Sequence, residues 1–447
     1  MTDLLADLQA RDLIHSTTDR EALAARLAKG PVTLYHGIDP TADSLHTGNL
    51  IGLLMLRRFQ EAGHRPLALA GGATGMIGDP SGRSQERNLL DEATLNANVA
   101  AIERQIASIV EMDGADRGRL VNNYAWTKDV SLLDFLRGVG KHVTVNTMLA
   151  RESVKIRMEG EDGISFTEFS YMLLQAYDYQ WLAEHEGCEL QVGCSDQWGN
   201  ILAGVDLIRR TRRQAVHALS WPLITAPDGS KLGKTTGARI WLDPDRTSPY
   251  QFFQHWMQTE DAQVREFLAK FTFLRVADEI EPLVAAHEQD PGKREAQRTL
   301  AREVTTLVHG AETCSRVEAV SSVTFDGSPV RGLRAAELSW LAGAWPHRGF
   351  VGSAAVEGTT VSSALLAIGL VKSRSEARRL MAQHGVRLND EVVLEDRVLA
   401  PADFLHDFAI VLKRGKRDFG VVFLDYLTYP ARPVWGIPAS QGGESRR

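Results

Sequence analysis

The feature that most limits the possible folds of this chain is a strand–helix–strand pattern in residues 32–70. Two short apolar runs of strand character, at 32–36 and 66–70, flank residues 45–62, whose apolar positions recur at helical spacing. A unit of this kind implies parallel strands joined by a right-handed crossover through the helix. The sequence therefore predicts an α/β fold that begins with a Rossmann-like parallel sheet.

The remaining chain divides into ranges of different character. The α/β pattern continues to about residue 225, and the next long segment has the apolar spacing of successive helices. A stretch rich in Ser, Gly and Ala then predicts a boundary before a second α/β segment. We expect six parts: a Rossmann-like domain (1–225), a loop and linker (226–246), a helical domain (247–320), a linker (321–358), a small α/β domain (359–425) and a disordered tail (426–447).

Composition excludes several classes of protein. The formal charge of −7 excludes a protein that coats nucleic acid over its whole surface, although a local basic patch remains possible. Three cysteines without C-x-x-C spacing cannot form a disulfide framework, which indicates a reducing compartment. No run approaches the roughly 20 apolar residues of a membrane span, and the early acidic residues predict an amphipathic helix rather than a secretory signal. We expect a cytoplasmic protein without membrane contact.

The first motif with chemical potential is GIDPTADSLHTGN, residues 37–49. It leaves a strand and enters a helix, so that His46 and Asn49, three residues apart, share a helical face. Free N–H groups and the helix dipole attract anions at such a terminus, which favours a phosphate site. A capped surface helix is the alternative.

The second motif is the glycine-rich segment GGATGMIGDPSG, residues 71–82. Five glycines in twelve residues directly after a strand indicate that the backbone comes close to another group. The spacing matches neither the P-loop nor the dinucleotide fingerprint. A glycine-rich turn that packs strand on helix explains it equally well.

The third motif is a helix with polar positions on an otherwise apolar background, residues 165–179. Tyr171, Gln175 and Asp178 recur at helical spacing and form one stripe. If this helix is buried, each unpaired polar group costs about 1–3 kcal/mol unless a ligand satisfies it. A ligand with an amine and a hydroxyl would do so, whereas a solvated face would need none.

The fourth motif is GCSDQWGN, residues 193–200, at the carboxyl end of an apolar run. Open parallel sheets bind ligands at that edge. Asp196 and Gln197 could hold ribose hydroxyls or an ammonium group. A strand-to-helix turn capped by Ser195 or Asp196 is the alternative.

The fifth motif is KLGKT, residues 231–235, within a polar loop. Lys231 and Lys234 could form a mobile cationic clamp on a polyphosphate leaving group, whose charge grows in the transition state. Most loops of this kind are simply solvated.

In their order and spacing, these motifs resemble those of the bacterial tyrosyl-tRNA synthetase family of class I aminoacyl-tRNA synthetases. The resemblance runs from about residue 30 to about residue 425. LYHGIDPTADSLHTGN resembles the HIGH-type signature and KLGKT the KMSKS-type signature, whereas YMLLQAYD and GCSDQWGNI resemble segments of the tyrosine enzyme. Two departures are Asn49 at the last HIGH position and Leu232-Gly233 in place of Met-Ser.

The resemblance implies a role for each matching residue. Tyr35, Asp79, Tyr171, Gln175 and Asp178 would bind tyrosine, with Tyr35 and Asp178 on its phenol and Asp79 and Tyr171 assisting Gln175 around the ammonium. Gly37, Asp39, Thr41, His46 and Asn49 would bind ATP, and Gly193, Asp196 and Gln197 would surround the ribose and adenylate. Lys231, Lys234 and Thr235 would grip pyrophosphate.

The resemblance also implies the reaction and its partners. L-Tyrosine and ATP would form tyrosyl-adenylate and pyrophosphate, and tyrosine would then pass to the 3′ end of tRNA(Tyr). Mg²⁺ should arrive with ATP, since no carboxylate cluster suggests a dedicated metal site, and no permanently bound cofactor is expected. Family members are homodimers, and the apolar, aromatic region 124–150 is a plausible interface.

The segment 359–425 resembles an S4 RNA-binding domain, and the helical domain would be the anticodon-stem domain. Basic residues on one face of a small module form an electrostatic footprint for phosphates, although a solvated charge run looks the same in sequence. The candidates are Lys372, Arg374, Arg378, Arg379, Lys413, Arg414, Lys416 and Arg417.

Three other functions remain to be distinguished. A tryptophan-type class I synthetase would share the fold and chemistry, but the polar stripe of the third motif and the S4-like segment argue against it. Other nucleotidyltransferases with an HxGH-like motif are short and lack the later domains. A catalytically inactive S4-type RNA-binding protein would have no reason to keep the charged residues of the motifs.

Overall fold

The structure is a computed structural model that describes residues 3–81, 90–112, 117–160, 163–225, 239–345, 347–352, 356, 358–415 and 418–425. It forms two compact units: Met1–Asp243 with Thr259–Leu300, and Pro244–Gln258 with Ala301–Arg447. The predicted tail 426–447 lies outside the described residues. The domain limits expected from the sequence stay predictions.

The first unit is built on a six-stranded sheet with the order β1-β6-β5-β2-β3-β4. β1 pairs antiparallel with β6, and the other pairings are parallel. The expected strands at 32–36 and 66–70 are β2 and β3, so the predicted parallel sheet is confirmed. The strands are β1 (Ser16–Thr17), β2 (Thr33–Ile38), β3 (Arg65–Ala70), β4 (Arg119–Asn122), β5 (Cys188–Cys194) and β6 (His217–Trp221).

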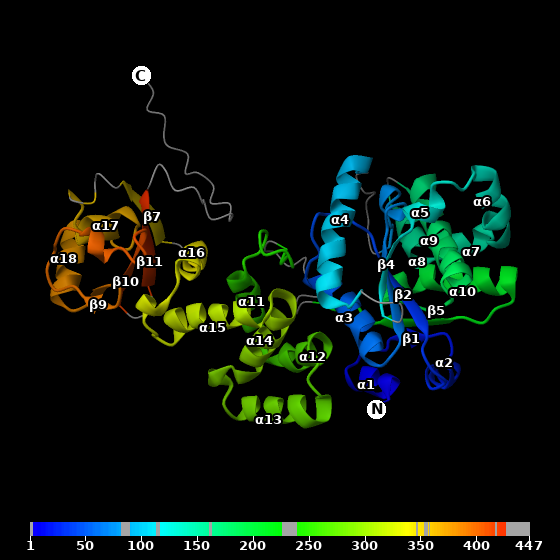
Figure 1. The fold of residues 1–447 in the computed structure, drawn as a ribbon, viewed down its shortest axis with the longest axis horizontal. Helices are drawn as coiled ribbons and strands as arrows, with labels where there is room; N and C mark the ends of the chain where they lie inside the picture. The colour runs from blue at the N-terminus through cyan, green and yellow to red at the C-terminus, as the bar shows by residue number, and fades with distance from the viewer. Residues whose placement is uncertain are drawn as a thin grey trace, which may run out of the picture. The chain divides into compact units, whose positions relative to one another are not determined.

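Helices cover both faces of this sheet (Figure 1). On β2, Tyr35 packs against Tyr179 of α9 with ring centroids 5.3 Å apart, whereas the His36 ring lies against Gly52 of α3. Neighbouring strand residues point to opposite faces, so α3 and α9 lie on opposite sides. The helices are α1 (Leu4–Ala10), α2 (Arg20–Leu27), α3 (Thr47–Glu61), α4 (Glu92–Ile109), α5 (Tyr124–Thr127), α6 (Leu132–Gly138), α7 (Val145–Leu149), α8 (Glu152–Glu159), α9 (Phe166–His185), α10 (Trp198–Arg212), α12 (Asp261–Phe271) and α13 (Glu281–Gln289).

The amino-terminal segment differs from the expected single amphipathic helix. It contains α1 and α2, separated by the short strand β1. The first helix ends at Ala10, and Asp12 adopts a positive φ of 55°, which a continuing helix does not allow. The side chain of Asp19 then accepts a hydrogen bond from the Ala22 N–H and starts α2.

The strand order creates a crevice at one edge of the sheet. The chain runs from β2 to β3 and β4 on one side, and β5 then returns to the other side of β2. Ligands of open α/β sheets bind at such a reversal, outside the carboxyl ends of the strands. The motifs that follow β2 and β5 therefore meet at this edge.

The second unit combines helices with a five-stranded sheet of order β7-β11-β10-β8-β9. The helices expected in 247–320 are present, but the range expected as a linker, 321–358, contains α16 and β7, and β7 pairs parallel with β11. Pairing with β11 supplies hydrogen bonds that a lone linker lacks. The elements are α11 (Pro249–Met257), α14 (Glu295–His309, shared with the first unit), α15 (Ala311–Phe325), α16 (Ala335–Ala344), β7 (His347–Gly352), α17 (Val361–Ala367), α18 (Arg374–Ala382), β8 (Val386–Leu388), β9 (Glu391–Val392), β10 (Ala409–Arg414) and β11 (Asp418–Asp425).

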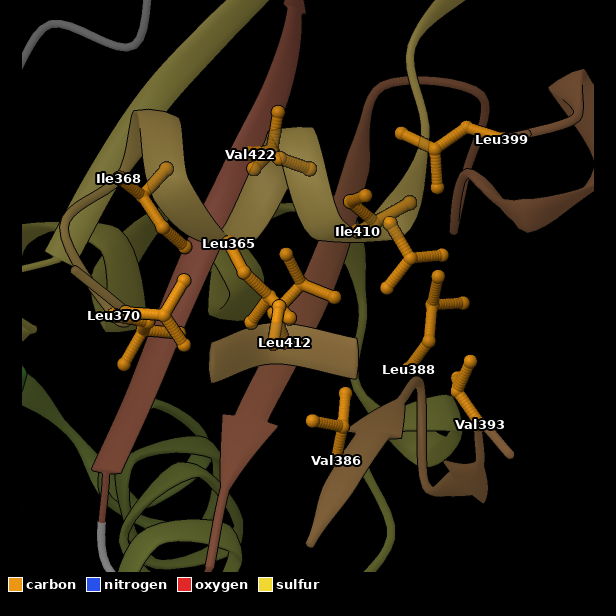
Figure 2. Close-up of a cluster of buried hydrophobic side chains, with 14 of the residues drawn as sticks. Leu365, Ile368, Leu370, Val386, Leu388, Val393, Leu399, Ile410, Leu412 and Val422 are labelled. Carbon is orange, nitrogen blue, oxygen red and sulfur yellow. The ribbon is translucent and has the colours of Figure 1, made fainter. Parts of the chain in front are cut away.

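A separate hydrophobic core holds the carboxyl-terminal part of this unit together (Figure 2). Alternate residues of β8 and β10 point to one face of the sheet, and α17 packs on that face. The labelled side chains are Leu365, Ile368, Leu370, Val386, Leu388, Val393, Leu399, Ile410, Leu412 and Val422. Within the described residues, no helix is both long and apolar enough to cross a membrane.

Candidate active site

A cavity of about 320 Å³ opens at the carboxyl ends of β2 and β5. Its size is in the range of small-molecule sites. It brings together predicted residues from four of the five motifs. They are Tyr35, Gly37, Asp39, Thr41, His46, Asn49, Asp79, Tyr171, Gln175, Asp178, Gly193, Asp196 and Gln197. Lys231, Lys234 and Thr235 of the fifth motif lie outside the described residues.

The Asp178 carboxylate is buried in the wall of this cavity, with 3% of the residue exposed. Asn123 donates its Nδ2–H to Oδ2 and Trp126 donates its Nε1–H to Oδ1, both at 2.9 Å. Burial raises the pKa of Asp178 to about 7, although both hydrogen bonds oppose the shift. The carboxylate is thus fixed in orientation and titrates near neutral pH.

Three buried polar atoms around the cavity have no hydrogen-bond partner among the described residues. They are the Tyr35 hydroxyl, Gln175 Oε1 and Gln191 Oε1. Tyr35 on β2 and Gln191 on β5 are neighbours in the strand register. An unpaired buried polar group costs about 1–3 kcal/mol, so a bound ligand with matching polar groups would recover that energy.

A hydrogen-bond network joins residues predicted to bind tyrosine to a residue predicted to bind ATP. Tyr171 donates its hydroxyl hydrogen to Asp39 Oδ2 at 3.0 Å, and Thr74 donates its own to Asp39 Oδ1 at 2.8 Å. Asn123, which holds Asp178, also donates to Thr74 Oγ1 at 3.0 Å. Tyr171, expected to assist Gln175, therefore directs its hydroxyl to a residue expected at ATP.

Asp79 lies between the second and fourth motifs and is 7% exposed. Gln197 donates its Nε2–H to Asp79 Oδ2 at 2.7 Å, and the backbone N–H of Ser81 donates to Oδ1 at 2.9 Å.

At Gly193, a Cβ atom would come within 2.9 Å of the Ile201 side chain. Glycine there lets the end of β5 approach α10.

At the start of α3, the backbone N–H groups that we expected to be free are already hydrogen-bonded within the protein. The N–H of Thr47 donates to the Ile240 carbonyl at 3.0 Å, and the N–H of Asn49 donates to the His46 carbonyl at 2.8 Å. The N–H of Gly48 donates to His46 Nδ1 at 3.0 Å. The expectation is wrong for these three groups, and at this point an anion must be held by the dipole and by side chains.

These contacts define what His46 and Asn49 can offer a ligand. Because His46 Nδ1 accepts a hydrogen bond, a neutral His46 carries its proton on Nε2 and donates from there. Asn49 Oδ1 accepts from the His46 N–H at 3.1 Å, which leaves the Asn49 amide N–H groups as donors. The predicted HIGH-type residues therefore also cap their own helix.

The sequence motifs do not point to four residues that surround the cavity or hold its side chains: Asn123, Trp126, Gln191 and Thr74. Asn123 and Trp126 follow β4, the next strand of the same sheet, and a polar pair at a strand's carboxyl end was the available signal. Gln191 is a polar residue within an apolar strand, and Thr74 lies in the glycine-rich segment.

The basic residues predicted to bind RNA lie partly in ion pairs. Lys372, Arg374 and Arg379 are exposed, as is Arg378, whose guanidinium pairs with Asp396 at 3.2 Å. On β10 the half-buried Arg414 pairs with Asp418 at 2.6 Å, and the half-buried Lys413 ammonium lies 4.5 Å from the centroid of the Phe419 ring. Lys416 and Arg417 lie outside the described residues. Their role in RNA binding stays a prediction.

Comparison with known proteins tests the resemblance. The family model described as tRNA synthetases class I (W and Y) matches residues 27–326. The tyrosine–tRNA ligase of Anaeromyxobacter dehalogenans (strain 2CP-1) is 47% identical over 423 residues, covering 94% of this chain and 99% of that protein. The tyrosine–tRNA ligase of Roseiflexus castenholzii is 46% identical over 431 residues, covering 95% of this chain and 100% of that protein.

A solved structure agrees with these relatives. The crystal structure of a C-terminally truncated Aspergillus nidulans mitochondrial tyrosyl-tRNA synthetase has a TM-score of 0.65 and 33% identity, covering 73% of this chain and 95% of its own. The predicted fold class is confirmed, and these relatives are of the tyrosine type rather than the tryptophan type. The chain therefore belongs to the tyrosine–tRNA ligases, the tyrosyl-tRNA synthetases of class I.

Proposed function

We propose that the cavity at β2 and β5 carries out tyrosine activation with ATP, followed by transfer of tyrosine to the 3′ end of tRNA(Tyr). The observation that carries the proposal is a pair of buried residues that line the cavity, Tyr35 and Asp178. The Tyr35 hydroxyl has no partner among the described residues, and the Asp178 carboxylate is held in place beside it. A substrate phenol satisfies both groups.

The amino acid would be held at both of its polar ends. Tyr35 and Asp178 bind the phenol, and Asp79 and Gln175 bind the ammonium group, with Tyr171 in support through Asp39. The tyrosine carboxylate is already ionised and attacks the α-phosphate of ATP without a general base. Catalysis then consists of positioning and charge stabilisation.

The nucleotide would occupy the part of the cavity beside α3 and β5. Gly37, Asp39 and Thr41 follow β2, and His46 and Asn49 begin α3. Gly193, Asp196 and Gln197 bind the ribose side, and Lys231, Lys234 and Thr235 the pyrophosphate. Mg²⁺ enters with ATP as part of the substrate. Among the described residues, no three His, Cys, Asp or Glu side chains gather as a metal site.

The first experiment is ATP–pyrophosphate exchange with tyrosine, tryptophan or phenylalanine. We expect exchange that depends on tyrosine alone, because only tyrosine presents a hydroxyl to Tyr35 and Asp178. Exchange that depends on tryptophan would instead indicate the specificity of a tryptophan-type class I synthetase. Absence of exchange with all three amino acids, in folded protein, would contradict the proposal.

The active form would be a homodimer of two such chains. Eight large apolar side chains are exposed on helices α6 to α9: Leu132, Leu133, Leu136, Val145, Leu149, Ile156, Met158 and Phe166. Exposed apolar side chains gathered on neighbouring segments of the chain are typical of an interface. Part of it lies in the range 124–150 expected from the sequence, and a second copy of this chain is the partner that the family resemblance implies.

Replacing Phe166, 79% exposed, by Glu should convert the dimer into monomers, because two charges would be buried in the interface. The matched control is Phe325→Glu, which changes an exposed Phe of α15 outside the patch. Sedimentation velocity of both variants and the parent protein measures the result. A Phe166→Glu protein that sediments like the control would remove this patch as the interface.

The second unit would bind the tRNA through its exposed basic residues, in the manner expected of an S4 domain.

We place the protein in the cytoplasm. Supporting this location, Cys188, Cys194 and Cys314 are all free thiols.

A further inference from the structure

Arg239 is a cation at the cavity that no motif accounts for. It lines the cavity together with His46, Gly48 and Asn49. The backbone that follows it is held against the start of α3: the Ile240 carbonyl accepts from the Thr47 N–H at 3.0 Å, as described above. The backbone next to Arg239 is thereby held against the start of α3, beside the proposed phosphate end.

Its side chain is also ordered by stacking. The Arg239 guanidinium carbon lies 5.6 Å from the centroid of the Trp241 ring. The Trp241 ring in turn packs edge-on against the His46 ring, with centroids 6.1 Å apart. A guanidinium stacked on an aromatic face loses less freedom when it binds an anion, because part of its ordering is already complete.

The charge of Arg239 is available for a ligand. Across the described ranges, no carboxylate lies within ion-pair distance of it, and its side chain reaches solvent. The first three N–H groups of α3 are engaged within the protein. The phosphates therefore require side-chain donors here, and Arg239 supplies a full positive charge among them.

We propose that Arg239 binds the β- and γ-phosphates of ATP and the pyrophosphate that leaves. A guanidinium matches phosphate oxygens with two parallel hydrogen bonds, which an ammonium group cannot reproduce. The inference rests on the proposed function and assigns a phosphate contact to a residue outside the five motifs. The competing explanation is that Arg239 only clips the segment around Trp241 to α3.

The test compares Arg239→Gln and Arg239→Lys with the matched control Arg104→Gln, an exposed arginine of α4 outside the cavity. For Arg239→Gln we expect kcat/KM for ATP and for pyrophosphate to fall about tenfold, the loss of one charge-assisted contact. The KM for tyrosine should stay unchanged. Arg239→Lys should recover part of the loss, whereas a merely structural clip gives equal losses for Lys and Gln.

Direct binding of ATP and AMP assigns the contact to particular phosphates. Arg239→Gln should weaken ATP binding about tenfold and leave AMP binding unchanged, because AMP lacks the β- and γ-phosphates. Equal weakening of both nucleotides, or none, would overturn the inference. These outcomes leave the proposed function standing if the parent protein and Arg104→Gln catalyse tyrosine-dependent exchange. Loss of exchange in those two proteins would count against the function itself.

Discussion

His46→Asn should slow tyrosyl-adenylate formation by roughly 100- to 1000-fold while the free energy of unfolding stays the same. The activity falls because the variant lacks the Nε2–H that we propose donates to the developing charge, a loss of this size for one preorganised donor. The stability persists because Asn is a favourable N-cap and replaces His46 Nδ1 as acceptor for the Gly48 N–H. Rapid-quench kinetics and urea unfolding measure the two effects.

His46→Ala is the matched comparison. It removes the same donor and also the cap, so it should lose similar activity and, in addition, about 1 kcal/mol of stability. Tyrosine binding should be unaffected in both variants, since His46 lies at the proposed nucleotide end. Normal adenylate formation in His46→Asn would show that the imidazole serves only as a helix cap.

Asp178→Asn should lower kcat/KM for tyrosine roughly 10- to 150-fold, the range for a hydrogen bond to a charged group. The new amide N–H₂ must also face a donor, either Asn123 Nδ2 or Trp126 Nε1, so one of these loses its acceptor. Phenylalanine makes no hydroxyl contact and should be affected far less. The ratio of kcat/KM values for the two amino acids, measured by exchange, should therefore fall, as it should for Asp178→Ala.

The pH dependence of kcat/KM for tyrosine should follow from the Asp178 carboxyl group. Burial raises the pKa of Asp178 to about 7, and the ionised form is the one that accepts the substrate phenol. In the parent protein kcat/KM for tyrosine should rise with pH through about 7 and then level off, whereas Asp178→Asn should lack this rise. An unchanged tyrosine-to-phenylalanine ratio together with an unchanged profile would exclude Asp178 from the pocket.

As the pH rises, the contribution of Asp178 to folding stability should fall, whereas kcat/KM for tyrosine should rise. The folded protein binds the Asp178 proton more tightly than the unfolded chain, in which the pKa of an aspartate is about 3.9. The contribution of this group to stability is therefore complete at low pH and is lost as the pH rises from about 4 to about 7. Ligand binding that favours the ionised carboxylate offsets this loss.

Local patterns in the sequence were sufficient for many of the elements and for the convergence of four motifs at one cavity. The helical spacing in 45–62 and the flanking apolar runs correspond to α3, β2 and β3. Because parallel strands end at one edge, motifs placed after β2 and β5 converge without any knowledge of their contacts. The thirteen predicted site residues that the structure describes accordingly line one cavity, and their roles stay predictions.

Only the tertiary structure decided which polar groups meet. Gln191 faces Tyr35 because β5 returns beside β2, and Asn123 reaches Asp178 because β4 ends at the same edge. The Ile240 carbonyl accepts a hydrogen bond from the Thr47 N–H at the start of α3, a donor that the sequence analysis expected to be free for phosphate. The neighbouring Arg239 lines the cavity. Helical and strand periods are local properties of the chain, whereas these pairings depend on strand order and packing between residues far apart in sequence.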